Sequence, residues 1–527
     1  MNYFLIFALI AFSVGGVFSA LRQLQMFQQN SYYPSRYLKW LKSSKSPYFY
    51  LSLICLVAAL CLDTGTLYLP ILATLELVIR IIKSQKDRKK SIKKLVYTSR
   101  VKRLIVTLSL FYLICSFVAV FPYINEIVRF IFAAIVIVFG HLPQIPVLLS
   151  NLLNKPIENT ISNGFIKDAK RILKQNNNLT VIGVTGSFGK TSVKFMLNRL
   201  LSEKYNTLAT PESFNTPMGV VKTIRESLTP ATEIFIAEMG AKNIGDIKEL
   251  CDIVDPDYGI ITAVGPQHLE TFKTVQNVAN TKFELADACL KKGNGKVYVN
   301  FDSTDAKEKA ASLNSDKIIS YGDDNSLARA EKVTQTEKGT EFTVLYKEHN
   351  FSITTKLLGR HNLINLLGAI ALALDFGVSE AQIRYAVSSI KAPPHRLEMK
   401  GFINGATLID DAYNSNPVGC LEAVNVLGSF EGKKRIIVTP GLIELGDKEY
   451  ECNYNLGTAA AAKCDVIILV GQKRSVPMKD AIVKTDFNQN NLYVADSFLD
   501  AMKILREITD ENSVVLFEND LPDNYAG

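Results

Sequence analysis

The stretch Val181-Ile-Gly-Val-Thr-Gly-Ser-Phe-Gly-Lys-Thr-Ser192 decides how the larger part of this 527-residue chain folds. An apolar run that predicts a β-strand enters a glycine-rich turn, and a run with apolar residues at helical spacing follows. Glycines let successive backbone N–H groups point inward, and the N-terminus of a helix adds positive potential. The pattern predicts a nucleotide phosphate site built from Thr185, Gly186, Ser187, Gly189, Lys190, Thr191 and Ser192.

Two side chains of this loop have separate expected roles. The ammonium of Lys190 reaches the terminal phosphates, and the hydroxyl of Thr191 can ligate Mg²⁺. Val184 replaces the first glycine of the usual phosphate-loop pattern, with Gly183 and Gly186 on either side of it, so the loop is a variant. We therefore expect ATP and Mg²⁺ as the cofactors of this chain.

Short β-rich runs alternate with helical stretches after this loop. The expected strands are 180–184, 233–238, 258–262, 296–300, 407–409, 435–439, 466–470 and 514–517. Alternation of strands and helices predicts parallel sheets covered by helices on both faces. Because the region is too long for one sheet, we expect two α/β domains, 179–395 and 396–527, with a boundary near Pro393 and Pro394.

The first 154 residues have the composition of a membrane region. The expected transmembrane helices are the apolar stretches at about 3–21, 48–62, 66–82, 104–123 and 127–150. The first stretch has no basic segment before it and no clear cleavage site after it, which favours a retained helix over a signal peptide. Apolar residues at helical spacing in 155–178 predict an amphipathic linker helix.

Charge is divided unevenly between the two parts of the chain. Residues 1–155 hold 18 Lys and Arg against 4 Asp and Glu, whereas the remainder holds 41 against 47. The basic segments 22–46 and 83–103 predict loops that stay cytoplasmic and touch lipid head groups. We therefore expect a multi-pass protein of the cell membrane whose catalytic domains are cytoplasmic, and we do not expect a nucleic-acid partner.

Eight further motifs follow the phosphate loop in order. They are Asn215-Thr-Pro-Met-Gly219, Glu238-Met-Gly-Ala241 with Gly245-Asp-Ile247, Gly265-Pro-Gln-His-Leu-Glu270, Lys282-Phe-Glu284, Gly359-Arg-His-Asn-Leu-Ile-Asn365, Pro393-Pro-His-Arg-Leu-Glu398, Asp410-Asp-Ala-Tyr-Asn-Ser-Asn-Pro417 and Glu444-Leu-Gly446. Together with the loop, this series resembles the Mur ligase family, which builds the peptide stem of peptidoglycan. The resemblance implies a central ATPase domain and a C-terminal Rossmann-like domain.

The resemblance also implies a role for each matching residue. Glu238 and His268 would hold Mg²⁺ together with Thr191, and Lys282, once carbamylated by CO₂, would hold a second Mg²⁺. Lys190, Lys282, His268 and Arg396 would be catalytic. Nucleotide contacts would come from Asn365 to the adenine, Arg396 to the phosphates and Asp411 to the ribose. The substrate pocket would be lined by Asn215, Tyr413, Asn414 and Asn416.

The implied activity is an ATP-dependent carboxylate–amine ligation through an acyl-phosphate. The substrates would be a muramoyl tripeptide, linked to UDP or to a lipid, and D-alanyl-D-alanine. The UDP-binding domain that usually opens these ligases is replaced here by the apolar region. Alternatives are a Mur-like amide ligase for another acceptor, such as a lipid-linked precursor or polyglutamate, and an ATPase module of a transporter. Few paired charges occur in the apolar stretches, which argues against transport.

Overall fold

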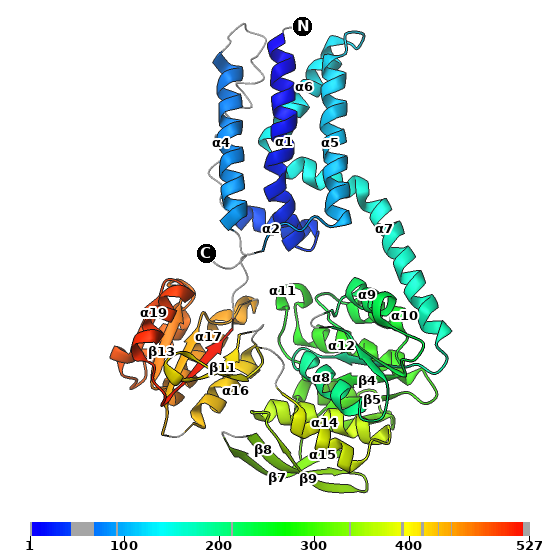
Figure 1. Cartoon of the computed structure of the whole chain (residues 1–527), viewed down its shortest axis with the longest axis vertical. Coiled ribbons are helices and arrows are strands. Elements are labelled where there is room, and N and C mark those ends of the chain that lie inside the picture. Colours follow the sequence, from blue (N-terminus) through cyan, green and yellow to red (C-terminus); the bar gives the residue numbers. More distant parts are fainter. Residues whose placement is uncertain are drawn as a thin grey trace. The chain divides into compact units, whose positions relative to one another are not determined.

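The computed structural model describes residues 3–43, 68–90, 93–211, 214–336, 339–391, 395–412, 416–430, 432–443 and 445–519. The chain divides into two compact units. Residues up to Gly164 form the first unit, and Phe165–Asp520 form the second. Figure 1 colours the chain from blue to red along the sequence.

The first unit is a group of packed helices. Its helices are α1 (Tyr3–Gln29), α2 (Pro34–Ser43), α4 (Tyr68–Lys90), α5 (Ser99–Val120), α6 (Glu126–His141) and the first part of α7 (Gln144–Gln175). Helix α1 packs against α4, α5 and α6, and α1, α4 and α5 run side by side in Figure 1. Buried side chains such as Phe12, Leu104 and Tyr112 form the core. The expected helix 48–62 lies outside the described residues.

The apolar helices match the expected spans in part. Helix α5 has the length and the mean hydropathy, 2.1, of a membrane-crossing helix. The expected span 127–150 is wrong as a single helix, because α6 ends at His141 and α7 starts at Gln144. Pro143 lacks a backbone donor and displaces the preceding residue from helical geometry, so the chain bends by 105° there. The expected linker helix 155–178 is the later part of α7.

The second unit begins with a nine-stranded sheet in the order β2-β3-β1-β4-β5-β6-β7-β8-β9. Its strands are β1 (Thr180–Thr185), β2 (Thr207–Ala209), β3 (Ile234–Glu238), β4 (Tyr258–Ile261), β5 (Lys296–Asn300), β6 (Ile318–Tyr321), β7 (Ala328–Thr336), β8 (Gly339–Tyr346) and β9 (His349–Thr355). Strands β1 to β6 are parallel, as expected. The all-parallel expectation is wrong at one edge, where β7, β8 and β9 pair antiparallel.

Helices cover both faces of this central sheet, as expected. One face packs on α8 (Lys190–Leu201), α14 (Arg360–Asp375) and α15 (Glu380–Ser389), whereas the other packs on α9 (Pro217–Ser227), α10 (Asp246–Val254) and α12 (Val275–Leu290). Strand β1 shows why both faces are covered. Ile182 and Val184 pack in the core with α8, α14 and α15, whereas Val181 packs in the core with α9, α10 and α12. Alternating side chains of a buried parallel strand are apolar on both faces. Short helices α11 (Leu269–Phe272) and α13 (Thr304–Ala311) complete the domain.

A second sheet forms the C-terminal domain, with the order β10-β11-β15-β12-β13-β14. Its strands are β10 (Glu398–Gly401), β11 (Thr407–Asp411), β12 (Lys434–Thr439), β13 (Val466–Val470), β14 (Leu492–Ala495) and β15 (Ser513–Glu518). Strand β10 is antiparallel to β11, and the others are parallel. Four helices pack around it: α16 (Pro417–Gly428), α17 (Glu449–Lys463), α18 (Val476–Ile482) and α19 (Phe498–Ile508).

Candidate active site

The phosphate loop joins the end of β1 to the start of α8. The backbone has φ +151° at Gly186 and φ +80° at Gly189, two conformations that favour glycine. Gly189 precedes α8 and has no side chain to cap the helix, so the first N–H groups of α8 face the loop. The Ser187 hydroxyl donates to the Gly265 carbonyl at 3.1 Å. These features form the anion-binding turn that the sequence predicts.

Lys190 lies folded over this loop. Its Nζ donates to the carbonyl oxygens of Gly186 at 2.8 Å and of Ser187 at 2.9 Å. The pKa of Lys190 is lowered to about 8, mainly by burial; the negative charge of Glu238 opposes this shift, and the positive charge of Arg396 adds to it. A terminal phosphate that enters the loop would offer the ammonium anionic oxygens in exchange for neutral carbonyls, so phosphate binding favours the charged form.

The carboxylate of Glu238 lies beside the loop at the end of β3. Its Oε1 accepts from the Thr191 hydroxyl at 3.2 Å and from the Asn215 side-chain amide at 3.0 Å. Its Oε2 lies 3.0 Å from Nζ of Lys194. A carboxylate and a hydroxyl next to a phosphate loop are hard oxygen donors of the kind that Mg²⁺ prefers. The residues therefore fit a magnesium ion that would be completed by phosphate oxygens and water.

Lys282 lies on α12 and is buried, with 1% of its side chain exposed. Burial holds the pKa of Lys282 well below its usual value, and the positive charge of Lys190 acts in the same direction. A lowered pKa leaves the ε-amine neutral for more of the time, and a neutral amine is the form that reacts with CO₂. The surroundings of Lys282 therefore suit carbamylation, and the modification itself stays a prediction.

His268 and Asn365 belong to segments that contact the loop. The loop carrying His268 is tied to the phosphate loop through Gly265, whose N–H donates to Ser187 Oγ at 3.2 Å. Asn365 is buried on α14, and a Cβ added at Gly189 would fall 2.7 Å from Asn365 Oδ1. The described residues contain no cluster of three or more His, Cys, Asp and Glu suited to a metal. Metal binding by His268 and adenine contact by Asn365 stay predictions.

The C-terminal domain contributes Arg396 and Asp411 to the same site. Arg396 lies near enough to both Lys190 and Asp411 for its positive charge to act on the pKa of each. Burial raises the pKa of Asp411 to about 6, although Arg396 and the backbone N–H of Leu397, 3.1 Å from Asp411 Oδ1, oppose the rise. A second contact between the domains is made by Glu422, whose Oε1 accepts from the Arg360 N–H at 2.7 Å.

Of the four predicted substrate residues, Asn215 and Asn416 belong to the described part of the chain. Tyr413 and Asn414 lie outside the described residues. Asn416 is the N-cap of α16, and its Oδ1 accepts from the N–H groups of Val418 at 3.1 Å and Gly419 at 2.8 Å. Asn215 holds Glu238 in place, as described above. The side chain of Asn416 therefore has a structural function at the start of α16.

The sequence predicted no role for Lys194 and did not place Glu518 beside Asp411. A charge at position 194 among the buried residues Val193, Met196 and Leu197 is a signal of a buried partner. Glu518 ends β15 in register with Asp411, is fully buried, and hydrogen-bonds to the Asp411 side chain. Glu518 lies beside Asp411 because β15 pairs with β11, and this pairing cannot be read from the sequence.

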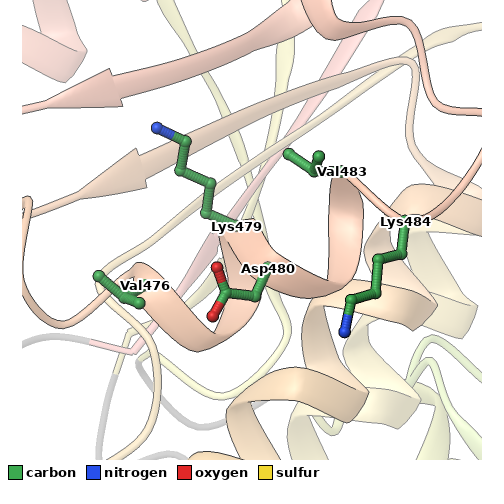
Figure 2. A pocket seen from close by; sticks show the side chains of 5 residues that line it. All are labelled: Val476, Lys479, Asp480, Val483 and Lys484. Carbon is green, nitrogen blue, oxygen red and sulfur yellow. The ribbon is translucent and has the colours of Figure 1, made fainter.

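A surface hollow in the C-terminal domain is separate from these groups (Figure 2). It lies over α18 and is lined by Val476, Lys479, Asp480, Val483 and Lys484. None of these five residues belongs to the phosphate loop or contacts Glu238 or Asp411 through a described hydrogen bond. The chemistry therefore resides at the phosphate loop and not in this hollow.

Taken together, the geometry defines a class of protein. A phosphate loop on one α/β domain meets an arginine and an aspartate from a second α/β domain, and a carboxylate lies beside the loop threonine. This arrangement is that of an enzyme that binds a nucleoside triphosphate between two domains and transfers its terminal phosphoryl group.

Comparison with known sequences gives the particular family. The Mur ligase middle domain matches residues 184–373, and the Mur ligase glutamate ligase domain matches residues 395–518. The UDP-N-acetylmuramoyl-tripeptide–D-alanyl-D-alanine ligase of Escherichia coli is 30% identical over 332 residues, which cover 61% of this chain and 73% of that protein. The Bacillus subtilis enzyme of the same name is 29% identical over 340 residues, covering 64% and 72%. The chain belongs to the Mur ligase family, whose members are ATP-dependent acid–amino-acid ligases.

Solved structures share the fold. MurF from Acinetobacter baumannii superposes with a TM-score of 0.62 at 24% identity, covering 69% of this chain and 78% of that chain. The MurF ligase from Thermotoga maritima in complex with ADP gives a TM-score of 0.61 at 24% identity, covering 69% and 81%. At this identity the similarity shows the arrangement of the two α/β domains.

Proposed function

We propose that this chain joins D-alanyl-D-alanine to the terminal carboxylate of a muramoyl tripeptide, with cleavage of ATP to ADP and phosphate. The names of the two relatives above support the choice of substrates. The structural observation that carries the proposal is the phosphate loop with its Thr191–Glu238 pair, close enough to Arg396 of the C-terminal domain for that charge to act on Lys190. A triphosphate in the loop would therefore lie near cations from both domains.

Two displacements make up the reaction. A carboxylate oxygen of the tripeptide attacks the γ-phosphorus, the bond to the bridging oxygen breaks, and ADP leaves, which gives an acyl-phosphate. The amine nitrogen of the dipeptide then attacks the acyl carbon, phosphate departs with the C–O bonding electrons, and the nitrogen loses a proton. Lys190 and Arg396 neutralise charge on the transferring group, and the two domains align the reactants, which supplies most of the catalysis.

ATP binding follows from the loop described above. Magnesium, when bound by Thr191 and Glu238, would neutralise phosphate charge next to Lys190. A carbamate on Lys282 would turn a buried amine into an anionic oxygen ligand, because carbamylation replaces N–H with N–COO⁻. The low pKa of Lys282 supports this modification. Intact-protein mass measured in bicarbonate, with loss of the added mass in Lys282→Met, would detect it.

The N-terminal unit is proposed to anchor the enzyme in a membrane. Large apolar side chains of α5 are exposed rather than packed, among them Leu110, Leu113 and Phe117. Side chains of this kind on an apolar helix suit contact with lipid. The basic segments around α2 and α4 would lie at the cytoplasmic head groups. We further propose that the anchor confines the ligase to a surface that holds lipid-linked acceptors.

The decisive experiment supplies ATP, Mg²⁺, D-alanyl-D-alanine and a muramoyl tripeptide to detergent-purified protein, and identifies the product by mass. We expect one amide bond per ADP released, and we expect Lys190→Ala to remove both products. Near-normal turnover by Lys190→Ala would contradict the proposed site. Acceptors carrying UDP and acceptors carrying a lipid are tested in parallel, and equal use of both would refute the proposed role of the anchor.

A further inference from the structure

The carboxylate of Glu238 is held by a lysine that the described reaction does not use. Lys194 has no exposed side-chain area, and Glu238 has 1% of its side chain exposed. Their Nζ and Oε2 atoms are 3.0 Å apart. Lys194 lies one helical turn after Lys190 on α8, so the same helix carries one lysine over the phosphate loop and one against Glu238.

The two oxygens of Glu238 have different partners. Oε2 faces Lys194, whereas Oε1 receives the Thr191 hydroxyl and the Asn215 amide. This division fixes the plane of the carboxylate, because a rotation would break contacts at both oxygens at once. The oxygen directed at the phosphate loop is Oε1. It accepts a hydrogen bond from Thr191, the threonine expected at the metal.

Stability alone gives a weak reason for such a pair. Taking two charges out of water costs about as much as their attraction returns, and apolar replacements of a buried ion pair are often neutral or stabilising. Met196 and Leu197 of α8 are buried in the apolar core, where an apolar side chain at position 194 would also pack. A buried lysine beside a candidate metal ligand therefore suggests a role in orienting that ligand.

The two lysines of α8 have different partners. The negative charge of Glu238 opposes the lowering of the pKa of Lys190, so these two groups attract each other. Nζ of Lys190 nevertheless donates to the loop carbonyls of Gly186 and Ser187. The described ion pair of Glu238 is the one with Lys194.

We propose that Lys194 is a positioning residue, which holds Oε2 of Glu238 so that Oε1 is presented to the magnesium ion of the nucleotide complex. The inference rests on the proposed function for the presence of Mg²⁺ and nucleotide. It assigns Lys194 no contact with ATP or with either substrate.

The test measures ADP binding by calorimetry on full-length, detergent-purified protein, with Mg²⁺ varied and with Mg²⁺ removed by chelator. Loss of a group that orients a metal ligand lowers metal affinity by about 10–100-fold. We expect Lys194→Met to raise the Mg²⁺ concentration needed for tight ADP binding by at least tenfold, with ADP affinity in chelator unchanged. Lys222→Met is the matched control, because Lys222 is an exposed lysine on α9 that pairs with Glu226.

A double-mutant cycle keeps the test valid if Lys194→Met alone folds poorly. In Glu238→Gln, addition of Lys194→Met leaves no unpaired buried charge, and we expect it to cause no further change in the Mg²⁺ requirement. Additive effects of the two substitutions, or a wild-type Mg²⁺ requirement in Lys194→Met, would overturn the inference. Failure of the wild-type protein to bind ADP at any Mg²⁺ concentration would instead refute the proposed function on which it rests.

Discussion

Gly186→Ala tests the geometry of the phosphate loop. A Cβ at this position would lie 1.9 Å from the Thr262 hydroxyl oxygen, 3.0 Å from Thr262 Cβ and 3.2 Å from the Ala263 carbonyl oxygen. Thr262 is fully buried, and its hydroxyl donates to the carbonyls of Thr185, at 3.2 Å, and of Phe188. The hydroxyl would therefore have to move by more than an ångström, and its hydrogen bonds would break.

The expected cost has three parts. A backbone conformation reserved for glycine costs about 1–3 kcal/mol, overpacking a core costs about 1–3 kcal/mol, and a lost buried hydrogen bond costs about 1 kcal/mol. The sum is roughly 3–7 kcal/mol by these magnitudes, which lowers the unfolding temperature of a domain of this size by on the order of 10 °C. Gly245→Ala is the control, because Gly245 has φ +89° but open space around its Cβ position, so it tests backbone strain alone.

The assay must report on the central domain. The single tryptophan, Trp40, belongs to the N-terminal unit, so tryptophan fluorescence does not serve. Cys251 and Cys289 are buried in the central domain, and thiol labelling of these two residues at rising temperature, read by peptide mass spectrometry, follows its unfolding. We also expect Gly186→Ala to lose ADP binding. If it is as stable as Gly245→Ala and binds ADP normally, the loop conformation described here is wrong.

Two further predictions concern the C-terminal domain. Asn416→Ala removes the N-cap of α16 and should destabilise that domain by about 1 kcal/mol. Labelling of the buried thiol of Cys420, on the same helix, should then begin at a lower temperature than in the wild type. Unchanged stability with a raised KM for the amine would favour a substrate contact instead. Burial raises the pKa of Asp411 from 3.8 to about 6, so its protonation stabilises the fold fully below pH 3.8, and this contribution is lost as the pH rises through 6. The unfolding temperature of the wild type should therefore fall relative to that of Asp411→Asn between pH 4 and pH 7, and parallel profiles would contradict this.

The sequence predicted the central parallel strands well, because each is a short apolar run next to a turn or helix signal. Strands β5 and β13 have the predicted bounds. Strands near the two ends of the central sheet were missed for a physical reason. Strand β7, ARAEKVTQT, is mostly polar because only part of it packs on the core, and the edge strand β2 has three residues. Such strands are defined by pairing with a neighbour more than by their own apolar pattern.

Site residues that are neighbours in the sequence were predicted from the residues themselves, whereas contacts between distant positions were not. The loop residues were predicted together because one turn and one helix N-terminus hold them. The approach of Arg396 to Lys190 joins positions far apart in the chain, so spacing did not reveal it, and only the resemblance suggested it. The single helix expected over 127–150 was wrong, although Pro143 was visible in the sequence. The hydropathy of 127–150 predicts one span, whereas the missing backbone donor of Pro143 interrupts the helix.

The sharing of the site between two domains has a consequence for inhibition. The two sheets have separate cores, and Leu358 of the central domain packs into the C-terminal one. The charge of Arg396 acts on Lys190 only while the domains keep their present orientation. A small molecule that bound beside the contact between Glu422 and the start of α14 and shifted the domains would separate these cations without occupying the nucleotide site. Such a compound would resemble neither ATP nor a peptide, and increasing either substrate would not outcompete it directly.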